Sequence, residues 1–256
     1  MQVYGDLRIV SARPTAADEA VVPHALYGSV DPGRRYSVGD WLRDLDHLDA
    51  PRPWILTGGT GLYFNALERG LAAIPAVPAD VRDDIEARIA AAGPASVHAD
   101  LARLDAEGAA RLDPADAQRV ARSLGVLVAT GRPIRDWQAR KPSRPTRGAV
   151  VRVVLEPPRP LLRERMAERF HGMMGEGAVE EVRALLARDL DPALPAMKAI
   201  GVREIAEMLR GGTTEADAVE RAIIATRQYA KRQSTWFRNQ FGPEWLRIAS
   251  AEEIEG

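Results

Sequence analysis

A basic and aromatic stretch near the carboxyl end of the chain holds the side chains best suited to bind an anion. Residues 226–238 contain no glycine or proline, so we expect them to form a helix. A helix that packs aromatic side chains on a core and presents cations on its other side suits a phosphate backbone. Charged faces are also common on surface helices that bind nothing. At 3.6 residues per turn, the cationic stripe comprises Arg227, Lys231 and Arg238, and the opposite side Tyr229, Trp236 and Phe237, with Gln233 between them and Arg232 at the border.

A glycine-rich turn, Gly58-Gly-Thr-Gly61, is the second feature that suits a ligand. It follows the short apolar run Trp54-Ile-Leu-Thr57, which we expect to be a buried parallel strand, and it precedes a helix from about Leu62 to Gly70. In α/β sheets, ligands bind beyond the carboxyl ends of such strands. The free amides at a helix start also attract anions. The residues alone are equally compatible with a tight turn that binds nothing.

The composition is that of a globular protein without cysteine chemistry. Its 256 residues are 46% hydrophobic and 28% charged, enough for one domain with an insert. The formal net charge is −1, so a nucleic-acid surface must be a local patch. The chain has no cysteine, which excludes disulfides and thiol catalysis, and its four histidines are too far apart in sequence to suggest a metal site. Without a membrane-length apolar run or a signal-peptide pattern, we expect a cytoplasmic protein.

The hydrophobic pattern predicts two α/β parts with a helical block between them. We expect residues 1–79 to form the first part of an α/β core and residues 148–256 its second part, which ends in the basic helix. In residues 80–147 apolar side chains recur at helical spacing, which indicates an inserted helical domain. We expect Lys141 to Arg147, rich in proline, serine and arginine, to be the hinge back to the core.

Several local patterns predict individual elements of the core. Leu7 to Ala12 alternates loosely and is expected to be extended, whereas Ser37 is expected to cap a helix that runs to Leu48. Val150 to Leu155 is rich in β-branched residues, which predicts a strand. Thr214-x-x-Asp217 can cap the long final helix. The acidic tail after Pro243 is expected to be peripheral.

Short motifs along almost the whole chain resemble, in order, those of the bacterial tRNA dimethylallyltransferases. The stretch Lys231 to Arg238 is similar to that family's K-R-Q-x-T-W-x-R string, which contacts tRNA. Each motif is weak alone, but their common order is a strong signal. The other motifs are Met1-Gln-Val-Tyr4, Ser11-Ala-Arg-Pro14, Gly58-Gly-Thr-Gly-Leu-Tyr-Phe64, Gln118-Arg-Val-Ala-Arg122, Thr130-Gly-Arg-Pro133 and Lys198-Ala-Ile-Gly-Val-Arg203.

The resemblance implies an α/β fold with a parallel sheet like that of P-loop NTPases and an inserted helical subdomain. In the family, an Asp-Ser pair precedes the segment that matches Met1-Gln-Val-Tyr4, and a strand, a phosphate loop of the type G-x-x-x-x-G-K-[ST] and a helix come before it. The sequence contains no match to that loop pattern. We therefore expect a core that is truncated at its N-terminus and lacks its first βα unit, with the phosphate loop and the base aspartate upstream of Met1.

The family reaction moves a dimethylallyl group from dimethylallyl diphosphate to the exocyclic amine of an adenine. That adenine lies 3′ of the anticodon in tRNAs that read codons starting with U. The leaving diphosphate needs donors and Mg²⁺, and the family's phosphate loop helps to hold the metal. The resemblance thus implies nucleotide binding, the tRNA anticodon stem-loop and the prenyl diphosphate as partners, and Mg²⁺ as cofactor. We expect no membrane partner and a monomer.

The resemblance assigns substrate and tRNA contacts to residues along the chain, but no catalytic residue. It implies that Gln2 borders the flipped base, that Thr60 lies near base and diphosphate, and that Arg13 faces the diphosphate. Two departures from the family pattern are Ala25, where a second histidine is usual, and Gly125, where glutamate is usual. The full set of expected contact residues is Met1, Gln2, Arg13, Thr60, Arg82, Gln118, Arg119, Arg122, Lys198, Gly201, Arg203, Lys231, Arg232, Gln233, Trp236 and Arg238.

Two other functions stay open at this point. The chain could be a non-catalytic RNA-binding remnant, because the phosphate loop and the base aspartate are absent from the sequence. It could also prenylate a small adenylate. The long basic helix argues against the small substrate, because a free nucleotide does not need such a surface.

Overall fold

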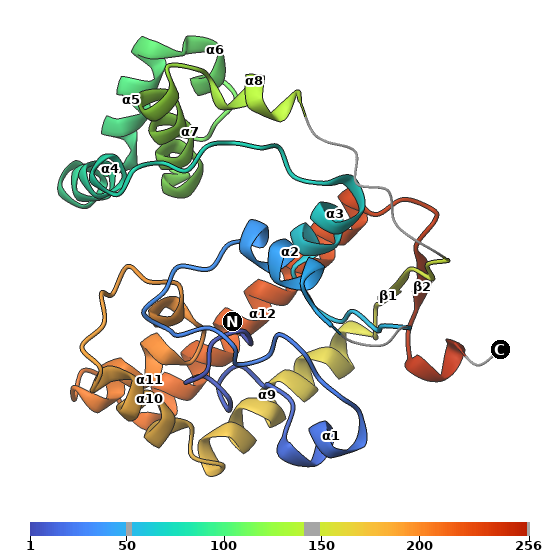
Figure 1. Ribbon diagram of the computed structural model, residues 1–256. Helices are drawn as coiled ribbons and strands as arrows, with labels where there is room; N and C mark the ends of the chain where they lie inside the picture. The colour runs from blue at the N-terminus through green and yellow to red at the C-terminus, as the bar shows by residue number, and fades with distance from the viewer. Residues whose placement is uncertain (50–52, 141–148, 255–256) are drawn as a thin grey trace. The chain divides into compact units, whose positions relative to one another are not determined.

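The computed structural model describes residues 1–49, 53–140 and 149–254, and the chain divides into two compact units. The first, here called the core unit, comprises Met1–Tyr63 and Gly148–Gly256, and the second, the helical unit, comprises Phe64–Arg147. Helix α3 (Gly61–Arg69) begins in the core unit and continues into the helical unit. Figure 1 shows the elements of both units. The expected hinge at Lys141 to Arg147 lies outside the described residues.

The core unit combines a small parallel sheet with helices, so the chain is of the α/β class. Strands β1 (Val153–Leu155) and β2 (Leu246–Ile248) pair in parallel, with Val153 opposite Leu246 and Leu155 opposite Ile248. A single parallel bridge also joins Tyr4 to Val30. Because parallel pairing needs a long connection, β1 and β2 come from segments far apart in sequence.

Among the described residues, six helices lie wholly within the core unit, and most of them surround one hydrophobic cluster. They are α1 (Ala16–Val21), α2 (Val38–Asp46), α9 (Arg159–Gly175), α10 (Ala178–Leu186), α11 (Val202–Leu209) and α12 (Glu215–Gln240), with short 3₁₀ turns η1 (Ala196–Lys198) and η2 (Ala251–Ile254). The cluster joins Tyr4, Leu7 and Val10 from the start of the chain to Phe170 of α9 and Ile205 of α11. The N-terminal segment is therefore part of the hydrophobic core.

Two predicted helix caps are confirmed in the core unit. Ser37 forms a capping box with Asp40 at the start of α2, and the Thr214 side chain accepts the backbone N–H of Asp217 at the start of α12. Each cap satisfies an N–H group that the first helical turn leaves without a partner. The long final helix thus begins at the predicted position.

The helical unit is a bundle of short helices around its own apolar cluster. Its helices are α4 (Ala79–Ala92), α5 (Pro94–Leu104), α6 (Ala106–Ala109), α7 (Ala117–Thr130) and α8 (Ile134–Gln138). The cluster contains Ile85, Leu101 and Leu124, all nearly inaccessible to solvent. Gly125 is buried in α7, where a β-carbon would lie 3.2 Å from a methyl of Val77. The glycine at this position, where the resembling family usually has glutamate, therefore allows α7 to pack closely against Val77.

Three predictions about the core unit are wrong. Trp54 to Thr57 forms no strand, and the Ile55 side chain is 89% exposed, because no described strand pairs with this run. Leu7 to Ala12 folds into turns, which a carboxylate described below holds in place. The tail after Pro243 is not peripheral at its start, because Trp245 and Ile248 are buried and β2 pairs with β1.

Within the described ranges, no helix combines the length and the apolar character that crossing a lipid bilayer requires.

Candidate functional site

The glycine-rich turn at residues 58–61 lies directly against the second half of α12. The Thr60 hydroxyl is 3.0 Å from the hydroxyl of Tyr229, so these two groups share a hydrogen bond. Next to it, Gln233 lies against Gly59 and the indole of Trp236 lies against Gly61. The three side chains occupy positions i, i+4 and i+7, which form one stripe of a helix. One face of α12 therefore holds the turn.

Two of the three glycines in this turn, Gly59 and Gly61, are required by contact and not by backbone conformation. A β-carbon at Gly59 would overlap the amide of Gln233, and one at Gly61 would overlap the six-membered ring of Trp236. Neither glycine has a positive φ angle. Glycine here serves close approach of the turn to the helix. The amide of Gln233 ends a flexible side chain, whereas the indole of Trp236 is rigid. A side chain added at Gly59 should therefore be tolerated better than one added at Gly61.

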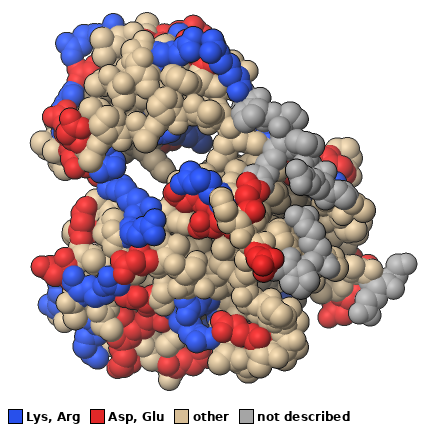
Figure 2. Space-filling view, in the orientation of Figure 1, with Lys and Arg blue, Asp and Glu red and all other residues tan. Residues whose placement is uncertain are grey.

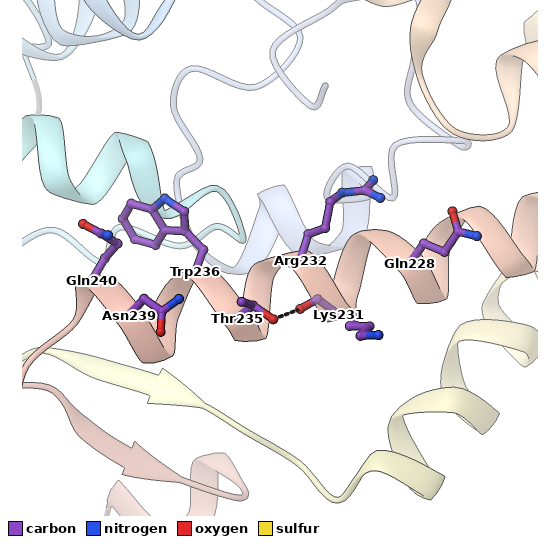
Figure 3. Close-up of a pocket in the computed structure, with 7 residues that line it drawn as sticks. All are labelled: Gln228, Lys231, Arg232, Thr235, Trp236, Asn239 and Gln240. Carbon is purple, nitrogen blue, oxygen red and sulfur yellow. Dashed lines mark hydrogen bonds between the residues drawn. The ribbon is translucent and has the colours of Figure 1, made fainter. Parts of the chain in front are cut away.

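A second face of the same half of α12 is open to solvent and forms a groove of about 480 Å³. Figure 3 shows Arg232 and Trp236 projecting from one side of the helix, with the Thr235 hydroxyl bonded to the Lys231 carbonyl. Each lining side chain carries a nitrogen or oxygen that can form hydrogen bonds, although apolar atoms make up most of the lining surface. The lining residues are Gln228, Lys231, Arg232, Thr235, Trp236, Asn239 and Gln240.

This half of α12 carries a local excess of positive charge. Residues 228–240 contain three lysine or arginine side chains and no carboxylate. Arg232 lies over the ring of Tyr229, with its guanidinium carbon 5.8 Å from the ring centre. Lys231 and Arg238 form no ion pair with any residue in the described ranges. Unpaired cations beside amide and hydroxyl donors form a surface that favours phosphate groups.

Phenol groups gather near the turn and remain protonated at neutral pH. Burial raises the pKa of Tyr63, and the neighbouring phenols of Tyr4 and Tyr229 raise it further. Burial also raises the pKa of Tyr36, whose hydroxyl donates a 2.6 Å hydrogen bond to the carboxylate of Asp44. Protonated phenols act as hydrogen-bond donors. The surroundings of the turn are therefore rich in donors on the core-unit side.

The N-terminal contact residues are held by backbone carbonyls. Gln2 donates its side-chain N–H to the carbonyl of Ala12 at 2.8 Å, and Arg13 donates from Nη1 to the carbonyls of Tyr4 and Gly5, each at 3.3 Å. Nε of Arg13 is buried without a partner in the described structure. Met1 is exposed. The segment is thus folded upon itself, and Arg13 is oriented by the backbone around it.

One carboxylate holds the turns that carry this segment. Glu181 on α10 accepts the backbone N–H groups of Arg8 and Ile9 at 2.7 Å and that of Val10 at 2.9 Å. Hydrogen bonds to a charged acceptor are stronger than neutral ones. A single side chain therefore satisfies three consecutive backbone donors, and the sequence alone gives no sign of this contact.

The residues around Gly201 form a separate corner of the core unit. Gly201 has φ of +94°, and its β-carbon would lie 3.3 Å from the Phe170 ring, so both conformation and space favour glycine. Its N–H donates to Glu204 at 2.8 Å. Lys198 and Arg203 on either side are exposed and unpaired within the described ranges. The space left by the missing side chain of Gly201 is thus taken up by Phe170.

In the helical unit, the expected contact residues lie on the exposed side of α7 and at the start of α4. Gln118, Arg119 and Arg122 are exposed, whereas Val120 of the same helix is buried. Arg119 pairs with Asp116 at 3.3 Å, so one of these cations is partly neutralised. The remaining residue, Arg82 on α4, pairs with Asp83 at 3.1 Å.

The structure thus brings together only part of the expected set. Thr60, Gln233 and Trp236 meet at the turn, and Arg232 joins them through Tyr229. Sequence analysis had placed Tyr229 on the aromatic side of the helix but had assigned it no function. The i, i+4, i+7 spacing from Tyr229 was a signal for its place beside Gln233 and Trp236. The groove residues that were not expected as contacts are Gln228, Thr235, Asn239 and Gln240.

No cluster of three or more histidine, aspartate or glutamate side chains that could hold a metal is found within the described ranges. Mg²⁺ in phosphate-binding sites is often bound by one or two carboxylates together with substrate oxygens. The described residues thus provide no protein cage for the metal expected from the sequence, and none of the chemistry below is assigned to it.

Comparisons with known proteins agree on one family. A family model described as IPP transferase matches residues 2–240. A tRNA dimethylallyltransferase of Mesorhizobium japonicum is 48% identical over 262 residues, which cover 100% of this chain and 81% of the relative. One of Agrobacterium fabrum is 48% identical, covering 97% and 85%.

Solved structures show the same likeness. A tRNA isopentenylpyrophosphate transferase of Bacillus halodurans superposes with a TM-score of 0.61 at 30% identity and covers 99% of this chain and 81% of that one. A eukaryotic dimethylallyltransferase that acts on tRNA gives a TM-score of 0.75 at 22% identity, with coverages of 99% and 66%, and shares the fold.

Proposed function

The chain belongs to the IPP transferase family, and we propose that it modifies tRNA by prenyl transfer. The donor in this proposal is dimethylallyl diphosphate, and the acceptor is the exocyclic amine of the adenine 3′ of the anticodon in tRNAs that read U-initial codons. The bond between the allylic carbon and diphosphate oxygen breaks, the bond from that carbon to the amine nitrogen forms, and the amine loses a proton. Diphosphate is the leaving group.

The single observation that supports this proposal best is the glycine turn packed on the cationic helix. In the proposal, the Thr60 hydroxyl donates to an oxygen of the substrate at the reacting centre. Arg232, Lys231 and Arg238 bind RNA phosphates along the open face of α12, where no carboxylate competes for them. We assign the general base to none of the described side chains.

The exposed face of α7 suits a second contact with RNA. Gln118 and Arg122 are exposed and have no partner within the described ranges, so both are available to the anticodon stem-loop. In the proposal, residues 80–147 form the tRNA-binding insert and residues 1–79 and 148–256 the catalytic core. A cytoplasmic location and a monomeric state belong to the same proposal.

A transfer assay with three acceptors tests the function. The chain is incubated with labelled dimethylallyl diphosphate and Mg²⁺, and with an anticodon stem-loop that has adenine 3′ of the anticodon, the same RNA with guanine there, or AMP. We expect label only in the first RNA. Label in AMP would favour a small-molecule prenyltransferase, and RNA binding without label would favour a non-catalytic RNA-binding protein.

Replacing Arg232 by alanine is expected to weaken binding of the stem-loop and its dependence on salt. One lost phosphate contact lowers the slope of log K against log salt by about 0.7–0.9. The measurement is the stem-loop affinity at several salt concentrations. Arg183→Ala is the matched control, because Arg183 is an exposed α10 arginine with a 3.5 Å ion pair to Glu180. If both variants keep the wild-type slope, α12 does not contact phosphate through Arg232.

A further inference from the structure

Tyr229 touches two residues of the candidate site at once. Its hydroxyl lies 3.0 Å from Thr60 Oγ1, and the guanidinium of Arg232 lies over its ring at 5.8 Å from the centre. The side chain is 38% exposed, so one of its sides faces solvent. Sequence analysis gave Tyr229 no role in the site, and its polar end meets a residue from a segment far away in sequence.

The contact with Tyr229 restricts the rotation of the Thr60 hydroxyl. A threonine hydroxyl has one proton and two lone pairs, and it rotates freely when nothing engages it. Either hydroxyl can donate in this contact. Because a phenol is the more acidic of the two, we take Tyr229 as the donor and Thr60 as the acceptor. The proton of Thr60 is then free to point toward a substrate oxygen, and the donated hydrogen bond makes Thr60 a stronger donor.

The ring contact fixes the position of a cation. Arginine stacks on aromatic faces, and this reduces the conformational freedom of a long side chain in the free protein. Arg232 borders the open groove of α12, as Figure 3 shows. An arginine that is already oriented loses less entropy when a phosphate binds it.

We propose that Tyr229 is a positioning residue with two separable effects: its hydroxyl orients Thr60 for prenyl transfer, and its ring orients Arg232 for RNA binding. This inference rests on the proposed function and adds to it a residue that acts through others. The two effects predict different outcomes for two substitutions at the same position.

The experiment compares Tyr229→Phe with Tyr229→Leu. For each, the affinity for the stem-loop and the single-turnover transfer rate at saturating RNA are measured. Tyr229→Phe keeps the ring, so we expect affinity within about twofold of wild type and a transfer rate lower by roughly tenfold, in the range of a lost transition-state contact. Tyr229→Leu also loses the ring, and we expect the same slow transfer together with roughly fivefold weaker binding and a smaller salt slope.

A double-mutant cycle separates positioning from simple loss of structure. Thr60→Val removes the partner hydroxyl, and the double variant Thr60→Val/Tyr229→Phe should transfer no more slowly than Thr60→Val alone, because both remove one contact. Tyr27→Phe is the matched control, since the Tyr27 hydroxyl forms a similar 3.2 Å contact with Thr57. We expect wild-type transfer from that control.

The possible negative results overturn different parts of the proposal. An active wild type with unchanged transfer in Tyr229→Phe, or additive losses in the double variant, would overturn the hydroxyl effect. Equal RNA affinity in the Phe and Leu variants would overturn the ring effect. A wild type that binds the stem-loop without transfer overturns the proposed reaction and the hydroxyl effect together, while the affinities still decide the ring effect. If the wild type neither binds the stem-loop nor transfers the prenyl group, the proposed function and both effects of Tyr229 are overturned.

Discussion

Replacing Gly61 by alanine is expected to lower the free energy of unfolding by about 1–3 kcal/mol, the usual cost of overpacking. The new β-carbon would overlap the indole of Trp236, a rigid ring wedged between the turn and the helix. Without this clash alanine should be tolerated, because Gly61 has no positive φ angle and begins α3. Chemical denaturation measures the change, and we also expect prenyl transfer to fall by more than tenfold as the turn moves away from α12.

Gly59→Ala is the matched control for that prediction. Its β-carbon would meet the terminal amide of Gln233, which can rotate away at little cost. We therefore expect a change within about 1 kcal/mol, the usual size for a surface substitution or a little more. If Gly59→Ala and Gly61→Ala destabilise equally, the rigidity of the indole is not what the turn responds to. A stabilised Gly61→Ala would show that the turn does not rest on Trp236.

Replacing Glu181 by alanine is expected to cost about 3 kcal/mol of unfolding free energy. Three backbone N–H groups would lose one charged acceptor. A hydrogen bond to a charged group contributes a net ~1.5–3 kcal/mol, and three bonds that share one carboxylate at partly exposed turns should lose less than three times that amount. At about 2–4 °C per kcal/mol for a chain of this size, the melting temperature should fall by roughly 6–12 °C. Differential scanning calorimetry provides the measurement.

Replacing Glu181 by glutamine tests whether its charge matters, and a variant at position 180 is the control. Glu181→Gln keeps the length but has one acceptor oxygen and a donor, so an intermediate loss is expected. Glu180→Ala is the control at the next position, since Glu180 is exposed and has only a 3.5 Å ion pair with Arg183, and its loss should cost less than about 1 kcal/mol. Equal effects at 180 and 181 would mean that the three hydrogen bonds do not hold the segment.

Local signals predicted the parts of the fold that depend on neighbours in sequence. The caps at Ser37 and Thr214 and the strand near Val154 follow from side chains within a few residues of each other. The family was likewise predicted from short motifs, and the family match confirms it. Failures came where distant segments decide the outcome. Trp54 to Thr57 has a strand's composition, but no described partner strand pairs with it.

The candidate site shows the same division. Periodicity alone placed Trp236 on the side of the helix opposite Arg238, but only the fold shows that the indole rests on Gly61, 175 positions earlier in the sequence. No pattern in the sequence pairs Glu181 with the amides of residues 8–10, because a glutamate on a helix has no signature for its partner. Contacts between side chains and a distant backbone depend on how segments pack, and pattern analysis does not give that packing.

Helix α12 is anchored at both ends by buried side chains. Val219 and Ala222 anchor its first turns in the main cluster, and just beyond its end Phe241 stacks on Trp245 with ring centres 3.8 Å apart. The span between these supports carries the cationic groove. A helix fixed at both ends resists fraying and rotation about its axis, so the angular spacing of its cations is set before any RNA arrives. If RNA binds here as proposed, its phosphates would meet cations whose positions around the helix are already fixed, so little reorganisation of the protein would oppose binding.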